Sequence, residues 1–493
     1  MTGAVVDDFD PATVLTDLGV TLRRITSDSR SVDPGAAFAA YPGVRADGRA
    51  HIPDALARGA AAVLWERHGF AWPAQYQVPQ RGIDDLAGRL GAIANLVYGA
   101  PSHDLWMVGV TGTNGKTSCS HWIAEAAEAC GRHAALVGTL GSGRIGALVP
   151  ARNTTPDVCV LHEALAQFRH ARVSLVAMEV SSHGLDQGRV NGVEFDVALF
   201  TNLTRDHLDY HGTMAAYGQA KAKLFAWPGL SAAVINADDP FGQSLIDAAR
   251  RRRQRVITYG LAGADIAATD LRMEARGLVL HVTTPWGSGR VATQVVGAFN
   301  AHNLMGVLGA LVASDIPFAA ALEALGEVTP PPGRMQRYGG VLQPLVVIDY
   351  AHSPDALEKA LGALRPAVAA GRELICVFGC GGDRDTGKRP QMGQIAATLA
   401  DRVIVTNDNP RGEDPAAISA AIVEGIRHTN ARHYRVEHDR ARAIRDAIAA
   451  ARPGDVVLVA GKGHETYQEA HGVRTPFSDA AEAAAALVAW SGE

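Results

Sequence analysis

Short apolar runs alternate with helix-like stretches along most of the chain, and this pattern predicts parallel sheets covered by helices. Four such runs occupy the middle of the chain, at 105–110, 173–180, 195–201 and 232–238. Four more follow the proline-rich segment TPPPGR and lie at 345–350, 373–379, 401–407 and 455–461. Each of these last runs precedes a loop and a helical segment, so we expect a second, doubly wound sheet with ligands at the carboxyl ends of its strands.

Two stretches depart from this pattern. Residues 51–66 indicate an amphipathic helix followed by a buried strand, and residues 268–297 alternate polar and apolar positions as a β-meander does. At roughly 100–200 residues per domain, 493 residues predict about three domains. We expect an α/β protein with three domains: a small N-terminal α/β domain (1–102), a central parallel-sheet domain with an added β-meander (103–334) and a C-terminal Rossmann-like doubly wound domain (335–493).

Composition excludes several classes of protein. Hydrophobic residues make up 47% and charged residues 20% of the chain, as in ordinary globular proteins. No uncharged apolar run reaches the roughly 18–20 residues that cross a bilayer, and the first 30 residues lack a signal-peptide core, so we expect a cytoplasmic protein without a membrane partner. A net charge of −5 argues against nucleic-acid binding. The five cysteines form no CxxC pair, which favours reduced thiols.

Lysine is rare in this chain. Only six of the 46 basic residues are lysines. They are Lys116, Lys221, Lys223, Lys359, Lys388 and Lys462. A composition so biased towards arginine raises the question of what these lysines do that a guanidinium cannot.

The clearest motif is GTNGKT at 112–117, which follows an apolar run and precedes a helical stretch. Its glycines let backbone amides surround a phosphate, Lys116 can reach the outer phosphates and Thr117 can bind Mg²⁺. Val110 stands where the strict P-loop pattern has glycine, so the motif is a variant P-loop. The alternative is a glycine-rich turn without a ligand, but the strand–loop–helix order favours nucleoside triphosphate binding.

Glu179 lies at the end of the second apolar run of the central domain, and His207 lies after the third. Because the carboxyl ends of neighbouring parallel strands meet at one edge of a sheet, we expect both near the P-loop, where they can complete a Mg²⁺ shell with Thr117. His183 and His211 are alternatives to His207. Each histidine can also be an ordinary surface or hydrogen-bonded residue.

Lys221 lies just beyond this histidine-rich loop, in a stretch that predicts a helix. A neutral lysine amine can react with CO₂ to give a carbamate, which acts as a carboxylate-like ligand and would bridge a second Mg²⁺. The alternative is a solvated helix lysine, which composition alone favours. Lys223, two residues on, is expected to point elsewhere.

Other polar motifs leave the phosphate acceptor open. The turn NTTP at 153–156 can bind a carboxylate or a sugar, or it can simply form the N-cap region of a helix. Asp349 closes a strand and can take a ribose hydroxyl. Arg334 can reach phosphates from the linker, or lie exposed at a hinge.

Three motifs follow strands of the C-terminal domain: GGDR at 381–384, DNPR at 408–411 and GKGHE at 461–465. Two arginines can pair with a carboxylate, and Glu465 can hold an ammonium, so the expected pocket suits a zwitterion. Without that context, DNPR is simply a good turn sequence.

Together these motifs resemble the Mur ligase family, and within it the members that add meso-diaminopimelate. The resemblance covers essentially the whole chain, and the motifs occur in the family's order and spacing. They are GTNGKT (112–117), NTTP (153–156), EVSSHGLDQGR (179–189), TNLTRDHLDYHG (201–212), AK (220–221), DYAHSP (349–354), GGDRD (381–385), DNPR (408–411) and GKGHE (461–465).

The resemblance implies three substrate sites. The ATP site comprises Gly112, Thr113, Asn114, Gly115, Lys116, Thr117, Ser118, Asn303, Arg334 and Asp349. The site for UDP-N-acetylmuramoyl-L-Ala-D-Glu comprises Ser29, Thr154, Thr155, Ser181, Gln187 and Arg189. The diaminopimelate site comprises Arg384, Asp408, Asn409, Pro410, Arg411, Gly461 and Glu465. The N-terminal domain would hold the UDP moiety, and in its loop Val44 replaces a histidine of a relative.

The implied reaction is ATP-dependent amide formation through an acyl phosphate, in peptidoglycan precursor synthesis and cell wall biogenesis. Lys116, Lys221 and His207 would be catalytic, with Thr117, Glu179, His207 and the Lys221 carbamate holding two Mg²⁺ ions. Arg411 favours diaminopimelate over lysine, because it pairs with a distal carboxylate and repels an ammonium. A lysine-adding relative, a folylpolyglutamate synthetase-like ligase and a non-ligase P-loop ATPase are the alternatives. A monomer is expected.

Overall fold

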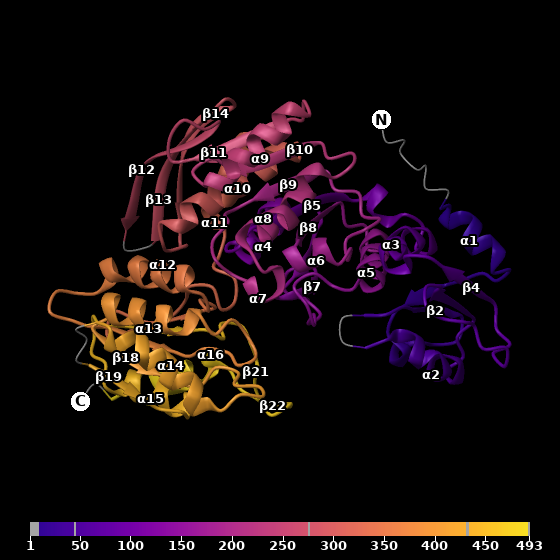
Figure 1. The fold of residues 1–493 in the computed structure, drawn as a ribbon. Helices are drawn as coiled ribbons and strands as arrows, with labels where there is room; N and C mark the ends of the chain where they lie inside the picture. The colour runs from indigo at the N-terminus through magenta and orange to yellow at the C-terminus, as the bar shows by residue number, and fades with distance from the viewer. Residues whose placement is uncertain (1–8, 44–45, 275–276, 430–432, 492–493) are drawn as a thin grey trace. The chain divides into compact units, whose positions relative to one another are not determined.

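The structure is a computed structural model that describes residues 9–43, 46–274, 277–429 and 433–491 (Figure 1). The chain forms two compact units, each built from more than one segment. The first comprises Met1–Thr111, Gly131–Leu199 and Ala220–Ala233, and the second comprises Gly112–Cys130, Phe200–Gln219 and Val234–Glu493. Each unit is described by itself. Val44 and Arg45, of the expected uracil-side loop, lie outside the described residues.

The first unit begins with a four-stranded parallel sheet in the order β1-β2-β3-β4. Its strands are Arg24–Thr26, Ala36–Ala40, Ala62–Glu66 and Gln80–Ile83, and its helices are α1 (Pro11–Asp17), α2 (Ile52–Ala57) and α3 (Leu86–Val97). Alternate residues of β2 face opposite sides of the sheet. Ala37 and Ala39 pack in the core that includes α1 and α3, whereas Phe38 and Ala40 pack in the core that includes α2. Helices therefore cover both faces, and the expected helix and strand within 51–66 are confirmed.

The first unit also contains most of five neighbouring strands of a larger sheet. Their order is β9-β5-β8-β6-β7. The strands are β5 (Trp106–Thr111), β6 (Ala134–Gly138), β7 (Gly141–Gly143), β8 (Leu175–Glu179) and β9 (Val197–Phe200). β5, β8 and β6 run parallel, and β7 is antiparallel to β6. The accompanying helices are α5 (Val158–His170) and α6 (Ser182–Asp186). β6, β8 and β9 are buried at every position, as expected for strands of a sheet with both faces covered.

The second unit contains the strand order β14-β13-β12-β11-β10. These strands are β10 (Ala232–Asn236), β11 (Val256–Gly260), β12 (Ile266–Glu274), β13 (Gly277–Thr284) and β14 (Gly287–Thr293). The antiparallel pairing of β12, β13 and β14 confirms the predicted β-meander. The helices are α4 (Lys116–Ala129), α7 (Leu208–His211), α8 (Met214–Ala222, which ends in the first unit), α9 (Pro240–Arg251), α10 (Phe299–Ala313) and α11 (Phe318–Glu327).

The C-terminal part of the second unit is a six-stranded sheet in the order β15-β16-β20-β17-β18-β19. Its strands are Gln336–Gly339, Leu345–Asp349, Val456–Ala460, Leu374–Phe378, Arg402–Val405 and Tyr434–Val436, in that order. Only the edge strand β15 pairs antiparallel within this sheet among the described residues. A hairpin of β21 (Tyr467–Ala470) and β22 (Val473–Pro476) follows.

Helices cover both faces of this sheet. One core cluster contains side chains of α12 (Pro354–Leu364), α13 (Lys388–Leu399) and α14 (Pro415–Arg427), and another contains those of α15 (Arg440–Ala449) and α16 (Asp479–Val488). Alternate residues of β17 supply the two clusters, with Cys376 and Phe378 in the first and Ile375 and Val377 in the second. The predicted doubly wound sheet is therefore confirmed.

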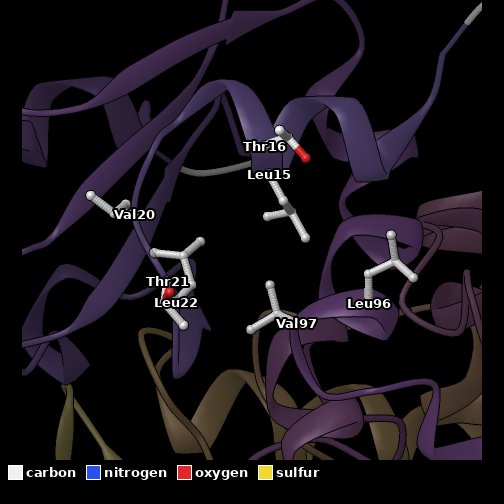
Figure 2. Close-up of a pocket in the computed structure, with 7 residues that line it drawn as sticks. All are labelled: Leu15, Thr16, Val20, Thr21, Leu22, Leu96 and Val97. Carbon is white, nitrogen blue, oxygen red and sulfur yellow. The ribbon is translucent and has the colours of Figure 1, made fainter.

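One pocket of about 270 Å³ lies between α1, the segment that follows it and α3 (Figure 2). It is lined by Leu15, Thr16, Val20, Thr21, Leu22, Leu96 and Val97. The lining offers two hydroxyl groups and no charged side chain, so it does not suit a nucleotide or a zwitterion. Among the described residues, no helix is long and apolar enough to cross a membrane.

Candidate active site

The loop that precedes α4 has the backbone shape of a phosphate-binding loop. Gly112 has a φ of +150° and Gly115 a φ of +89°, in the region that favours glycine. A Cβ atom on Gly115 would lie 2.5 Å from Oδ1 of Asn303, closer than a van der Waals contact allows. Glycine is therefore required at this position, and Asn303 lies against the loop. Ser118 is buried in the first turn of α4.

The segment after β9 holds this loop through hydrogen bonds. Thr201 Oγ1 donates to the carbonyl of Asn114 at 2.6 Å, and the backbone N–H of Asn114 donates to Asn202 Oδ1 at 3.0 Å. The N–H of Thr113 donates to the carbonyl of Asn202 at 2.8 Å. The loop is thus held in a defined shape by hydrogen bonds that do not involve a ligand.

Lys116 folds back over the loop. Its Nζ donates to the carbonyls of Gly112 and Thr113, both at 2.8 Å. An ammonium held at the mouth of a glycine-rich loop is well placed to exchange these carbonyl partners for anionic phosphate oxygens.

Arg334 connects the predicted linker to the phosphate-binding loop. Its Nη2 donates to Thr117 Oγ1 at 2.9 Å, and its guanidinium lies 4.5 Å from the centre of the Tyr350 ring. Its buried Nε has no hydrogen-bond partner among the described residues. A buried guanidinium nitrogen without an acceptor fits a site that receives an anion. The alternative of an exposed hinge arginine is therefore wrong.

Asp349 lies at the carboxyl end of β16, as predicted. Its carboxylate accepts a hydrogen bond from the N–H of Met335 at 2.8 Å. Burial raises the pKa of this carboxyl group, although the nearby Arg334 guanidinium opposes that shift. Asn303, Arg334, Asp349 and the P-loop all belong to the second unit.

Asp355 is a further contact of the P-loop that the sequence analysis missed. Asn114 Nδ2 donates to Asp355 Oδ2 at 2.8 Å, and Lys359 Nζ lies 3.0 Å from the same carboxylate. Asp355 stands in the first turn of α12, directly after DYAHSP. Its position directly after a recognised motif is the feature of the sequence that could have indicated this contact.

His207 lies beside a charged cluster. It has a φ of +53°, and its Nε2 is 3.6 Å from Asp206 Oδ2. Burial alone would raise the pKa of Asp206, but the positive potential of His207, His352 and Lys388 lowers it to about 2. Lys388 Nζ donates to the carbonyl of His352 at 2.8 Å. Only His207 of this cluster was a predicted site residue.

In the first unit, Glu179 ends β8 with its side chain fully buried. Its two carboxylate oxygens accept hydrogen bonds from the N–H and the hydroxyl of Thr139, at 2.7 and 3.1 Å. Thr139 Oγ1 also lies 3.0 Å from Thr154 Oγ1, within hydrogen-bond distance. Glu179 is therefore held in one orientation beside the NTTP turn. Thr139 belongs to none of the recognised motifs, so its contact with Glu179 was not predictable from them.

The predicted sugar-peptide residues gather around the same turn. Thr155 Oγ1 donates to the carbonyl of Glu179 at 2.9 Å and lies 3.0 Å from Ser181 Oγ. Arg189 donates to the carbonyl of Thr155 at 2.9 Å and to Gln187 Oε1 at 2.6 Å. Thr154, Thr155, Ser181, Gln187 and Arg189 therefore form one group. Ser29 lies apart from them in sequence, buried in the short 3₁₀ helix Ser29–Ser31.

Lys221 lies in α8, as predicted, and only 1% of it is exposed. The alternative of a solvated helix lysine is therefore wrong. The Lys223 side chain is 48% exposed, and its Nζ lies 2.9 Å from Asp186 Oδ1. The two lysines occupy different environments, and burial of Lys221 fits a paired or modified amine.

The loops after β17, β18 and β20 gather the predicted amino-acid-binding residues. Arg411 Nη1 donates to the carbonyl of Gly382 at 2.8 Å, and its backbone N–H donates to Glu469 in β21 at 3.1 Å. Asn409 Nδ2 donates to Glu465 Oε2 at 2.8 Å. Cationic, anionic and amide groups thus meet at the carboxyl end of one sheet, where the doubly wound fold predicts a ligand.

The other residues predicted for the amino-acid site lie in the same loops. The N–H of Asn409 donates to Asp408 Oδ1 at 2.7 Å, and a Cβ atom on Gly461 would lie 2.6 Å from Asp408 Oδ2. Pro410 is buried, whereas Arg384 is exposed and donates to the carbonyl of the preceding residue, Asp383, at 3.3 Å. Gly461 therefore permits the close approach of two of the three loops.

Within the parts of the chain that the structure describes, no three His, Cys, Asp or Glu side chains gather as a metal-binding cluster.

Three family models match: the Mur ligase family catalytic domain at 21–98, the Mur ligase middle domain at 110–311 and the Mur ligase glutamate ligase domain at 333–463. A relative from Chromobacterium violaceum, named UDP-N-acetylmuramoyl-L-alanyl-D-glutamate–2,6-diaminopimelate ligase, is 53% identical over 98% of this chain and 97% of its own length. The chain belongs to the Mur ligase family.

Solved structures extend the comparison. A structure titled as UDP-N-acetylmuramoyl-L-alanyl-D-glutamate–2,6-diaminopimelate ligase is 38% identical to this Mur ligase, with a TM-score of 0.67 and 95% coverage of both chains. Folylpolyglutamate synthase from Mycobacterium tuberculosis is 22% identical, with a TM-score of 0.63, and covers 75% of this chain and 91% of its own, which shows the fold alone. The expected three-domain α/β fold is confirmed, whereas the boundaries at 102 and 334 stay predictions.

Proposed function

We propose that this Mur ligase joins meso-diaminopimelate to the D-glutamyl γ-carboxylate of UDP-N-acetylmuramoyl-L-Ala-D-Glu, with ATP as the energy source, and so makes a peptidoglycan precursor. The observation that carries the proposal is the cluster of Arg411, Asn409 and Glu465 at the carboxyl end of the C-terminal sheet. A cluster of mixed charge suits an amino acid with both ammonium and carboxylate groups.

ATP as the phosphate donor rests on family membership and on the P-loop. The related folylpolyglutamate synthase structure is titled as a complex with ADP and AMPPCP. The left-handed glycines, Lys116 over the loop and the buried Arg334 Nε fit a polyphosphate. In the proposed reaction the γ-carboxylate attacks the γ-phosphorus of ATP, the bond to the bridging oxygen breaks, ADP leaves and an acyl phosphate forms. The neutral amine of diaminopimelate then attacks the acyl carbon, phosphate leaves, and the amide nitrogen loses a proton.

The chain's own residues have defined roles in this scheme. Lys116 balances the negative charge on the transferred phosphoryl group, and the network of Thr154, Thr155, Ser181, Gln187 and Arg189 binds the peptide part of the nucleotide substrate. Arg411 binds the distal carboxylate of diaminopimelate. Since the attacking carboxylate and amine both belong to substrates, catalysis depends mainly on positioning and charge stabilisation.

Two Mg²⁺ ions and a Lys221 carbamate are further parts of the proposal. In the second unit Thr117 and His207 would hold Mg²⁺, and in the first unit Glu179 and the Lys221 carbamate would do so. The buried carboxylate of Glu179 and the buried position of Lys221 support this assignment. When bound, the ions offset charge on the phosphate oxygens. A monomeric state and a cytoplasmic location stay predictions.

A substrate panel tests the proposal. Phosphate release is measured with each substrate omitted in turn, and with lysine in place of diaminopimelate. We expect release only when ATP, UDP-N-acetylmuramoyl-L-Ala-D-Glu and diaminopimelate are all present, and much slower release with lysine. Release without an amino acid would favour the non-ligase ATPase, and equal use of lysine would contradict the role of Arg411.

A further inference from the structure

Lys462 is one of the six lysines of the chain, and the proposed chemistry gives it no role. It lies in GKGHE directly after β20, and its side chain is 0% exposed. A buried ammonium is unfavourable unless it is paired, so its neighbours indicate what it does.

Its ammonium lies 5.5 Å from the centre of the Tyr467 ring, and its hydrogen-bond partners are two residues proposed to bind the amino acid. Lys462 Nζ donates to Asn409 Oδ1 at 2.9 Å and to Glu465 Oε2 at 2.7 Å. Asn409 Nδ2 donates to the same Glu465 oxygen at 2.8 Å. The three side chains therefore close a triangle that joins the loop after β18 to the loop after β20.

The triangle fixes the orientation of the Asn409 amide. An ammonium only donates hydrogen bonds and an ionised carboxylate only accepts them, so the amide oxygen must face Lys462 and its NH₂ must face Glu465. The backbone N–H of Glu469 also donates to the amide oxygen, at 2.9 Å. Both described side-chain partners of Glu465 contact Oε2, which leaves Oε1 as the oxygen that can accept from a substrate ammonium.

Buried hydrogen bonds also hold the two loops that carry the triangle. Arg440 and Asp479 form a fully buried ion pair with an N–O distance of 2.7 Å. Arg440 Nη1 donates to the carbonyl of Asn407 at 3.2 Å, and its Nη2 donates to that of Ala460 at 2.9 Å. These carbonyls directly precede the DNPR and GKGHE loops, so movement of either loop would break buried hydrogen bonds.

We propose that Lys462 is a positioning residue for amino-acid recognition. It holds Asn409 and Glu465 in one arrangement, and its positive charge offsets that of Glu465, so that the pocket prefers a zwitterion with a distal carboxylate to a more cationic amino acid such as lysine. This inference rests on the proposed function, because it assigns the ligand of the same site.

The test compares Lys462→Met with the wild-type protein and with Lys223→Met, a matched change at an exposed lysine. We expect KM for diaminopimelate to rise about 10- to 100-fold in Lys462→Met, because a charged hydrogen-bond donor is lost. KM for ATP is expected to change less than about twofold. A twofold change corresponds to a much smaller difference in binding free energy than a tenfold change does. The ratio of kcat/KM for diaminopimelate to that for lysine is expected to fall.

Chemical rescue separates positioning from folding. In Lys462→Ala, propylammonium replaces the lost carbons and ammonium, and it is expected to lower KM for diaminopimelate when it is added to the assay; propanol is the neutral control. Lys462→Gln, which keeps an amide donor, is measured if the other variants do not fold.

Three results would overturn the inference: an unchanged KM for diaminopimelate, an equal rise in KM for all substrates, or unfolding of all three variants. Failure of the proposed function is a distinct outcome, because the wild-type protein itself would then not ligate diaminopimelate.

Discussion

Arg411 is the residue on which the proposed choice of amino acid depends. It has a φ of +51°, and its backbone and guanidinium are both hydrogen-bonded, to Glu469 and to Gly382. A guanidinium held this firmly loses little further entropy when it pairs with a carboxylate. Selectivity against lysine then follows from charge, because the distal ammonium of lysine would face a fixed cation.

Replacing Arg411 with alanine is expected to lower kcat/KM for diaminopimelate about 100-fold or more, since the proposed ion pair with the distal carboxylate is lost. Steady-state phosphate release measures the effect. Arg435→Ala is the control, because Arg435 pairs at the surface with Asp446. Equal losses in the two variants would contradict the role of Arg411.

At the scale of elements, the P-loop and α4 depend on glycine where the chain enters the helix. Gly115→Ala is expected to raise KM for ATP about tenfold or more, because its left-handed φ and the contact with Asn303 both oppose a Cβ atom. Gly131→Ala is the control, since Gly131 has a φ of +81° but open space around its Cβ position. Gly131→Ala is expected to lower stability without changing KM for ATP. A similar change in KM for ATP in the two variants would contradict the special requirement for glycine at position 115.

The same helix carries a histidine that makes stability depend on pH. Burial lowers the pKa of His121 to about 4 from an ordinary value of 6.5. Below pH 6.5 the unfolded chain takes up a proton that the folded chain excludes, so stability falls as pH decreases from about 6.5 to about 4. The total loss is about 3 kcal/mol.

Urea unfolding at pH 7 and pH 4.5 measures this dependence. His121→Gln is expected to lose less stability than the wild-type protein over that interval, whereas His103→Gln, at an exposed position, is expected to behave as wild type. An unchanged pH dependence in His121→Gln would assign the effect to other groups.

The first residues of α15 and α16 are joined by the buried pair of Arg440 and Asp479. Asp479→Asn is expected to lower the free energy of unfolding by about 3–5 kcal/mol, because it leaves a buried guanidinium without its counter-ion. Asp446→Asn breaks an exposed pair and is expected to lower it by less than about 1 kcal/mol. Urea unfolding at pH 7 compares them, and equal losses would show that burial of the pair is not decisive.

For the whole molecule, sequence patterns predicted both sheet types because buried parallel strands and meanders have different periods. The apolar runs at 345–350 and 455–461 correspond to β16 and β20, and the alternating run to β12–β14. Motifs also located the P-loop and the loops that carry the proposed amino-acid site, since strand ends bring distant loops together.

Contacts that depend on packing were not predictable in the same way. Nothing in the sequence indicates that Thr139 holds Glu179, or that Asp355 contacts Asn114, because these pairs are 40 and 241 residues apart. Lys462 stood inside a recognised motif, yet only its buried contacts show which residues it joins.

The most direct test of the central claim follows oxygen from substrate to product. UDP-N-acetylmuramoyl-L-Ala-D-Glu is labelled with ¹⁸O in the γ-carboxylate and incubated with ATP and diaminopimelate, and mass spectrometry identifies the phosphate and the peptide product. We expect one ¹⁸O atom in each phosphate released, together with one molecule of the diaminopimelate-containing tripeptide. Unlabelled phosphate, or phosphate release without tripeptide, would contradict ligation through an acyl phosphate.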